Sequence, residues 1–325
     1  MRAVTRRKCN RANDFCDVIR IRGWRCVRGG TDRLIRLRCR HRRTRIRAVL
    51  MRPNTRVLAG AGDIAKRGPG KEATAKLLDA IDPDVVAALG DLAYDQGTLD
   101  QFMTLYNPTW GRHKAKTKPA LGNHEYLTPG AAGYFDYFNG VGAATGPAGE
   151  RGKGYYAYDL GAWRFYVLNS ACTPAGGCGA TSPQTRWLRD DLAANPRPCV
   201  GAYWHTPRFS AGQYSDDADF APFWQALYDG GAELVLVASD HLYQRYVPMR
   251  ADGTVDRARG IREFVVGSGG ADHSDLRPRP DGKREAANDD TFGVIKLTLH
   301  PDGYDWRFVP EAGKRYSDAG SASCH

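Results

Sequence analysis

The fold can be predicted from residues 85–94, which read Val85-Val86-Ala87-Ala88-Leu89-Gly90-Asp91-Leu92-Ala93-Tyr94. Five consecutive apolar residues are typical of a strand that is buried on both faces of a sheet. The strand ends at a glycine, and a carboxylate follows it directly. A buried strand with a polar residue at its carboxyl end is the pattern of α/β proteins, whose sites lie at that edge of the sheet.

Strands and helices are expected to alternate along most of the remaining chain. Further strands are predicted over 55–59, 119–121, 200–204 and 234–238, and helices over 72–81, 99–106, 183–194 and 220–228. A hairpin is predicted from 155–160 and 163–168, and residues 130–154 are expected to be an irregular surface excursion. The last third is β-rich, with strands over 263–266, 293–299 and 304–309. This order predicts two packed sheets with helices outside.

Four other segments also place polar residues after an apolar strand. They read Gly62-Asp63, Gly122-Asn123-His124-Glu125, Trp204-His205-Thr206-Pro207 and Asp240-His241-Leu242-Tyr243-Gln244-Arg245. Together with the first segment they supply carboxylates, an amide and imidazoles, a mixture that suits Zn²⁺, Mn²⁺ or iron better than Ca²⁺. Two metal ions about 3.5–4 Å apart need a shared carboxylate, and Asp91 is the expected bridge.

These five segments resemble those of the calcineurin-like metallophosphoesterase superfamily, in particular its purple-acid-phosphatase-like branch of exported bacterial type. The feature that indicates this branch is Tyr94, three residues after Asp91, since a tyrosinate is a hard anionic ligand that stabilises Fe³⁺. The resemblance extends from about Arg56 to the C-terminus. It implies an α/β fold, a four-layer α/β/β/α sandwich of two mixed sheets.

The resemblance also implies roles for individual residues. The first metal, expected to be iron, would take Asp63, Asp91, Tyr94 and His241, and the second, zinc, manganese or iron, would take Asp91, Asn123 and His205. The catalytic residues would be His124, which would hydrogen-bond the phosphate and protonate the leaving group, and Asp91. Substrate binding is assigned to Asn123, His124, His205, Tyr243 and Arg245, with packing around the site as the alternative for the last two.

Two positions depart from the family pattern. The fifth segment is expected to read Gly-His-x-His, but the chain has Ser239 where the first histidine, a ligand of the second metal, would stand. Thr206 replaces a second histidine that exported relatives carry after the fourth-segment ligand. A serine hydroxyl is a poor neutral ligand, so we expect water to fill the gap and the second site to be weak. A protein with one metal is the alternative.

The expected activity is metal-dependent hydrolysis of small phosphoesters by a metal-bound hydroxide, most simply by an acid-phosphatase-like phosphomonoesterase. A phosphodiesterase on the same scaffold is one alternative. A phosphate-binding relative that Ser239 has impaired is the other. Residues 267–270 read Gly-Ser-Gly-Gly, which lacks the Lys-Ser/Thr of a P-loop, so no nucleotide role is assigned. His273, in Gly269-Gly270-Ala271-Asp272-His273, is expected to be a solvent-exposed loop residue, with the border of the pocket as the alternative. A monomer is the default expectation.

The basic charge is confined to one end of the chain. Residues 1–52 hold 18 basic and three acidic residues, whereas residues 53–325 hold 29 and 33, and the scattered arginines follow no helical or strand period. We therefore predict two parts, an Arg-rich segment 1–52 and a catalytic domain 53–325. The segment is expected to be disordered or to result from a start site placed too far upstream. A nucleic-acid arm is disfavoured, because the aromatic residues of single-strand binders are missing.

The cysteines divide in the same way. Cys9, Cys16, Cys26 and Cys39 fit no zinc pattern, and Cys172 and Cys178 enclose a short loop that can close as a disulfide. Cys199 and Cys324 would then pair the C-terminus with the core, although four free thiols are the alternative. Disulfides predict an exported protein. No signal peptide is recognisable, and no stretch approaches the ~20 apolar residues of a membrane-spanning helix.

Overall fold

The computed structural model describes residues 5–6, 15–21, 24–31, 34–41, 44–51, 55–214 and 216–325. The chain divides into two compact units, residues 1–56 and 57–325. In the first unit an antiparallel sheet is formed by β1 (Thr5–Arg6), β2 (Phe15–Ile21), β3 (Trp24–Thr31), β4 (Leu34–His41) and β5 (Thr44–Met51). The side chains of this unit before residue 55, including its four cysteines, lie outside the described residues. The assignment of residues 1–52 to a separate segment with a misplaced start stays a prediction.

The second unit is built on two mixed sheets. One has the order β11-β12-β13-β14-β16-β15-β17: Tyr156–Leu160, Trp163–Val167, Cys199–Tyr203, Ala232–Val237, Arg262–Val266, Tyr243–Tyr246 and Arg284–Asn288. The other has the order β20-β19-β18-β6-β7-β8: Ala319–Ser323, Gly303–Pro310, Gly293–His300, Arg56–Ala61, Val85–Leu89 and Thr117–Ala120. A small hairpin pairs β9 (Thr145–Gly146) with β10 (Gly149–Glu150).

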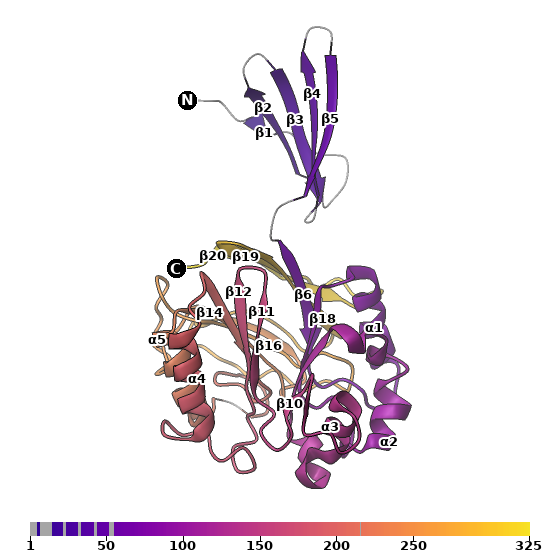
Figure 1. Cartoon of the computed structure of the whole chain (residues 1–325), viewed down its shortest axis with the longest axis vertical. Coiled ribbons are helices and arrows are strands. Elements are labelled where there is room, and N and C mark those ends of the chain that lie inside the picture. The colour runs from indigo at the N-terminus through magenta and orange to yellow at the C-terminus, as the bar shows by residue number, and fades with distance from the viewer. Residues whose placement is uncertain are drawn as a thin grey trace. The chain divides into compact units, whose positions relative to one another are not determined.

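Helices cover the outer face of each sheet (Figure 1). On one side lie α1 (Gly70–Ile81), α2 (Leu99–Gln101) and α3 (Ala132–Asn139), and on the other lie α4 (Pro183–Ala194) and α5 (Ala221–Asp229). Apolar residues of both sheets, such as Val86, Phe165 and Leu236, form one cluster between them, while α4 and α5 pack over a second cluster. The predicted four-layer α/β/β/α sandwich of the metallophosphoesterase fold is therefore confirmed.

The site lies at the carboxyl ends of five strands, three in one sheet and two in the other. Strands β6, β7 and β8 run parallel in one sheet, and β12, β13, β14 and β16 run parallel in the other. The five polar segments follow β6, β7, β8, β13 and β14 directly. Because these strands end at the same edge of the sandwich, side chains far apart in the sequence meet there.

The main differences from the predicted elements lie in polar or glycine-rich stretches. Residues 130–154 contain a helix, α3, whose aromatic side chains Tyr134, Phe135 and Phe138 are buried. The predicted helix over 99–106 continues beyond α2 as a π-helix over Phe102–Tyr106. Five strands of the second unit, β9, β10, β15, β17 and β20, were not predicted, since their residues alternate weakly or are mostly polar and small.

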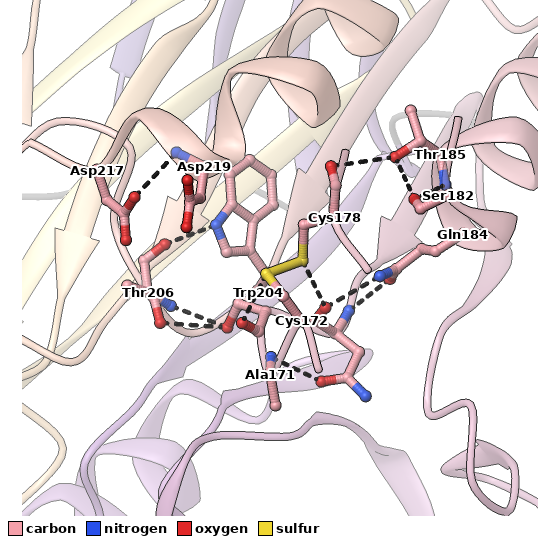
Figure 2. The surroundings of a disulfide bond; sticks show 12 residues. Ala171, Cys172, Cys178, Ser182, Gln184, Thr185, Trp204, Thr206, Asp217 and Asp219 are labelled. Atoms are coloured by element: carbon pink, nitrogen blue, oxygen red, sulfur yellow. Dashed lines mark hydrogen bonds between the residues drawn. A yellow bond between two sulfur atoms is a disulfide. The ribbon is translucent and has the colours of Figure 1, made fainter. Parts of the chain in front are cut away.

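Both predicted disulfides are present, Cys172–Cys178 and Cys199–Cys324. Figure 2 shows the first beside Trp204 and Thr206, in the loop that follows β12. Next to this disulfide, the hydroxyl of Ser170 accepts from the backbone N–H of Thr206 over 3.2 Å, so the loop touches the segment that carries His205. In the described part of the chain, no helix has the length and apolarity needed to cross a membrane.

Candidate metal centre

The first two carboxylates of the site occupy an uncommon backbone conformation. Asp63 follows β6 with a φ of 57°, and Asp91 follows β7 with a φ of 52°. Few residues other than glycine adopt the left-handed region, and those that do cluster at functional sites. Both side chains are almost fully buried. The sharp turn after each strand therefore directs a buried carboxylate towards the space between the strand ends.

Five of the predicted ligands meet there. Ligand atoms of Asp63, Asp91 and His205 all lie within 4.8 Å of one another. The hydroxyl of Tyr94 donates to Asp63 Oδ1 over 2.7 Å and lies 3.3 Å from Asp91 Oδ2. Nε2 of His241 lies 3.2 Å from both the Tyr94 hydroxyl and Asp63 Oδ1. The structure thus brings together, from both sheets, the residues expected around the first metal, together with His205.

The carboxylates of the cluster raise the pKa values of its two imidazoles. Burial lowers the pKa of His205, but the negative charges of Asp91 and Asp63 outweigh it and raise this pKa to about 10. For His241 burial is likewise outweighed by Asp63 and Asp272, and the pKa rises to about 9. A cation bound here would displace the protons of these imidazoles, as is usual for metal sites built from imidazoles and carboxylates.

One buried atom shows that a cation fits. Nε2 of His205 is buried without a hydrogen-bond partner, although it lies 3.2 Å from Asp91 Oδ2. The other ring nitrogen, Nδ1, is 2.9 Å from the carbonyl oxygen of Leu89, to which its N–H donates. A backbone carbonyl at Nδ1 is the arrangement that leaves Nε2 free to bind a metal.

The third segment contributes at the edge of the cluster. Asn123 is exposed and begins a short 3-10 helix, His124–Leu127. The backbone N–H of His124 donates to Asp91 Oδ1 over 2.9 Å, and its ring stacks at a tilt on Tyr94, 4.5 Å between centroids. Nδ1 of His124 contacts the carbonyl oxygen of Asp95, while Nε2 lies 3.8 Å from Asp91 Oδ2. Nε2 of His124 therefore faces the site.

The two departures from the family pattern lie beside the cluster. Ser239 is almost fully buried with a φ of 67°, and its backbone N–H donates to Asp63 Oδ2 over 2.8 Å. Thr206 donates both its N–H and its hydroxyl towards Ser170 Oγ, at 3.2 and 3.3 Å. Each residue makes contacts that support the surrounding loops.

Tyr243 and Arg245 belong to a different cluster. The hydroxyl of Tyr243 donates to Asp318 Oδ2 over 2.7 Å, and Arg245 pairs with Asp318 and Glu285. The guanidinium of Arg245 also lies over the ring of Trp306, 5.0 Å from its centroid. These contacts favour the alternative of packing and hydrogen bonding, and they give no support to a role in substrate binding.

Two buried glutamates that sequence reasoning missed hold the loops of the site. Glu125 accepts backbone N–H groups from Asp91, Leu92 and Gly122 at 2.8–2.9 Å, so one carboxylate connects the second and third segments. Burial, and then the charge of Asp91, raise its pKa to about 7. Glu263 accepts from the N–H groups following the fourth segment. Glu125 stands in a quoted segment, but neither glutamate has a sequence signal for such backbone contacts.

A third carboxylate, Asp240, anchors the loop in front of the site. It is fully buried, contacts the hydroxyl of Ser210 and accepts the backbone N–H of Tyr214 over 3.1 Å. The Tyr214 side chain is 52% exposed, and its pKa is raised by burial and then by the charges of Asp63 and Asp91. An exposed aromatic ring therefore lies within electrostatic reach of the two ligand carboxylates, which the sequence did not indicate.

Metallophosphoesterases are the class of protein that this fold and this site define. The comparison with protein families agrees: residues 57–243 match the model described as calcineurin-like phosphoesterase. The chain belongs to this family, and the predicted resemblance is confirmed.

Similar proteins include a curated relative and several solved structures. A nucleotide pyrophosphatase/phosphodiesterase of Hordeum vulgare is 25% identical over 279 residues, which are 74% of this chain and 72% of that protein. The purple acid phosphatase PPD1 from yellow lupin (Lupinus luteus) seeds is 18% identical with a TM-score of 0.67, over 92% of this chain and 60% of that one. GAP50 of Plasmodium, described as the anchor in the inner membrane complex, is 13% identical with a TM-score of 0.61, over 81% of this chain and 88% of that one. These structures share the fold, and the chain spans about three fifths of the lupin protein.

Proposed function

We propose that the chain hydrolyses small phosphoesters with two metal ions bound at this cluster, and that phosphomonoesters are its main substrates. The observation that carries the proposal is the buried Nε2 of His205, which has no hydrogen-bond partner and lies 3.2 Å from Asp91 Oδ2. An unpaired buried nitrogen is costly, and a cation shared by these two side chains removes the cost. Family membership supports the same chemistry.

The proposed ligand sets are those expected from the sequence. Asp63, Asp91, Tyr94 and His241 would hold the first ion, and Asp91, Asn123 and His205 the second. Burial, followed by the charges of Asp63 and Asp91, holds the pKa of Tyr94 far above its usual range. A cation bound between Tyr94 and these carboxylates would offset their charge, and a tyrosinate is a hard anionic ligand that suits iron, which we propose for the first position. Zinc, manganese or iron is proposed at the second, which Ser239 weakens.

When bound, such a pair of ions would neutralise the charge of a phosphoryl group and supply an activated water for in-line attack. The chain's own residues would do the rest. Nδ1–H of His124 donates to the Asp95 carbonyl oxygen, which leaves Nε2 as the ring nitrogen that faces the site. In the imidazolium form, Nε2 would give its proton to the leaving-group oxygen. Asp91 would be the shared carboxylate, fixed by the N–H of His124 and, through its own N–H, by Glu125. Asn123 and His205 are proposed to contact the phosphate.

Phosphodiester hydrolysis is the second candidate activity. It is favoured by the similarity to the barley protein, which is described as a nucleotide pyrophosphatase/phosphodiesterase. Phosphate binding without hydrolysis is the third, and it is favoured by Ser239 in place of a metal-binding histidine. The two disulfides support export as part of the proposal, because they persist in oxidising compartments.

The test compares p-nitrophenyl phosphate with bis(p-nitrophenyl) phosphate, using chain loaded with iron together with zinc or manganese. We expect the chain to release p-nitrophenol faster from the monoester than from the diester. Asp63→Asn should abolish this release while the fold is retained. Faster release from the diester would favour the second candidate. A chain that holds metal and phosphate but releases nothing would favour the third. Absence of both metal binding and hydrolysis would overturn the proposal.

A further inference from the structure

The loop after β16, residues 267–274, is a sixth segment of the site. Its backbone N–H groups donate to carbonyl oxygens on both sides of the cluster. Gly269 donates to Gly62, and Ala271 donates to Asp63, each over 2.9 Å. Ser274 donates to His241 over 3.1 Å. The loop therefore connects the first polar segment to the fifth through the backbone alone.

Glycines allow this loop to approach so closely. A Cβ atom on Gly267 would lie 2.7 Å from Asp63 Oδ2 and 2.1 Å from the carbonyl oxygen of Asp240. A Cβ atom on Gly269 would lie 2.2 Å from the carbonyl oxygen of Gly62. Both distances to carbonyl oxygens are too short for any side chain. The glycine-rich sequence is thus explained by contact with the ligand-bearing turns, without a bound nucleotide.

The loop carries one carboxylate, Asp272, to the back of a predicted ligand. One of its oxygens contacts Nδ1 of His241, and the other accepts from Nζ of Lys66 over 2.7 Å. With Nδ1 engaged, the nitrogen that faces Tyr94 and Asp63 is Nε2. A carboxylate behind a metal-binding imidazole fixes the ring, selects the coordinating nitrogen and raises its basicity.

Lys66 extends the chain of contacts back to the first segment. It stands three residues after Asp63, and its Nζ lies 5.7 Å from the centroid of the Tyr94 ring. The side chains of Lys66 and Asp272 are 38% and 47% exposed, so their pairing alone adds little to stability. Its geometric effect is larger, because the ammonium holds one oxygen of the Asp272 carboxylate while the other oxygen contacts His241.

We propose that Asp272 is a positioning residue for the first metal, which presents Nε2 of His241 to the ion and is itself oriented by Lys66. This inference rests on the proposed metal centre. Asp272 thus supports the one imidazole of the first position, whereas the second position has Ser239 where a histidine ligand was expected. The two sites should therefore differ in affinity in a way that depends on Asp272.

The experiment is a titration of the metal-free full chain with Zn²⁺ or Co²⁺, comparing Asp272→Ala, Asp272→Asn and the control Asp275→Ala. Asp275 is exposed directly after this loop, three residues beyond Asp272. We expect Asp272→Ala to weaken the tighter site about 10–100-fold, Asp272→Asn to weaken it less, and Asp275→Ala to leave it unchanged. The asparagine keeps an acceptor for Nδ1–H and keeps the volume, so its result holds if the alanine variant folds poorly.

A second readout separates positioning from general destabilisation. Long-range ¹H–¹⁵N spectra of the zinc-loaded chain should show His241 protonated at Nδ1 in the wild type, and a mixture of ring states in Asp272→Ala. Unchanged affinity with an unchanged ring state in both Asp272 variants would overturn the inference. A wild type that binds metal but cleaves no phosphoester would refute the proposed function alone, since the affinity differences would still support Asp272. A wild type that binds no metal would overturn both.

Discussion

The backbone N–H of Ser239 donates a 2.8 Å hydrogen bond to Oδ2 of Asp63. The bond uses the main chain, so it does not depend on which side chain stands at position 239. It joins the turn after β14 to the turn after β6, across the two sheets. Another side chain at position 239, such as the histidine expected from the family pattern, would therefore keep this support of Asp63.

Replacing Ser239 with histidine should strengthen metal binding at the second position. Ser239 has a φ of 67°, a region that histidine enters more readily than most residues. We expect Ser239→His to bind the second ion more tightly, which raises metal content at limiting metal concentration and raises kcat, because two ions share the phosphoryl charge. Elemental analysis and hydrolysis rates would measure this. Ser239→Ala is the matched control, and equal metal content in all three chains would contradict the prediction.

Removing the His124 imidazole should slow the chemical step. Its Nε2 faces the site, and acid catalysis by a positioned histidine contributes about 10²–10⁴-fold. We expect His124→Ala to lower kcat by that range with metal content unchanged. His300→Ala serves as the control, since His300 pairs with Asp305 beside the turn between β18 and β19. An unaffected kcat at full metal content would show that the assignment is wrong.

The stability of the chain should fall between pH 4.5 and 8 through Glu263. Burial, opposed by the N–H groups of Arg208 and Phe209, raises its pKa from 4.5 to about 8. Because the folded-state pKa is the higher one, the stabilising effect of the protonated carboxyl is complete below pH 4.5. It is lost as the pH rises through 8. The free energy of unfolding should fall by at most about 1.4 kcal/mol per pH unit from this one group.

Urea unfolding of metal-free chain across this window would measure the effect as a difference between variants. We expect Glu263→Gln to flatten the slope relative to the wild type. Glu150→Gln is the control, since the Glu150 side chain is 53% exposed beside Lys153, and it should leave the slope unchanged. Parallel slopes for the wild type and Glu263→Gln would rule out this origin of the pH dependence.

The two disulfides should contribute unequally to stability. They close loops with sequence separations of 6 and 125 residues. In the chain-entropy model, these lengths correspond to about 2 and about 5 kcal/mol. We therefore expect the serine pair at Cys199 and Cys324 to lower the free energy of unfolding more than the pair at Cys172 and Cys178. Urea unfolding of both variants at fixed pH would measure the two losses. A larger loss for the Cys172 and Cys178 pair would contradict the prediction.

The strand-end ligands could be predicted from sequence because each follows a long apolar run. Asp63, Asp91 and His205 stand directly after such runs, and strand direction alone places them at one edge. The helix α3 could not be predicted in the same way. Its aromatic residues lie among glycines that are typical of loops, and it is stabilised by the stacking of Phe102 on Tyr137, 5.1 Å between centroids.

The residues that orient the ligands were beyond sequence reasoning for a physical reason. Glu125, Glu263 and Asp272 act through backbone N–H groups or through the far nitrogen of an imidazole. Such contacts depend on how loops from different strands approach, and no spacing along the chain encodes them. Tyr243 and Arg245 illustrate the converse: they follow His241 closely in sequence, but they point towards Asp318 in β-rich surroundings.

The anchoring of Tyr214 has a consequence for how selectivity can evolve. Asp240 holds this residue by its main chain, so its ring can be exchanged without loosening the loop. The ligand turns below it are fastened separately, by Glu125 and by residues 267–274. We therefore expect substitutions at position 214 to change the exposed ring within electrostatic reach of the ligand carboxylates while the metal-binding turns stay in place, which makes this position a starting point for directed evolution of substrate range.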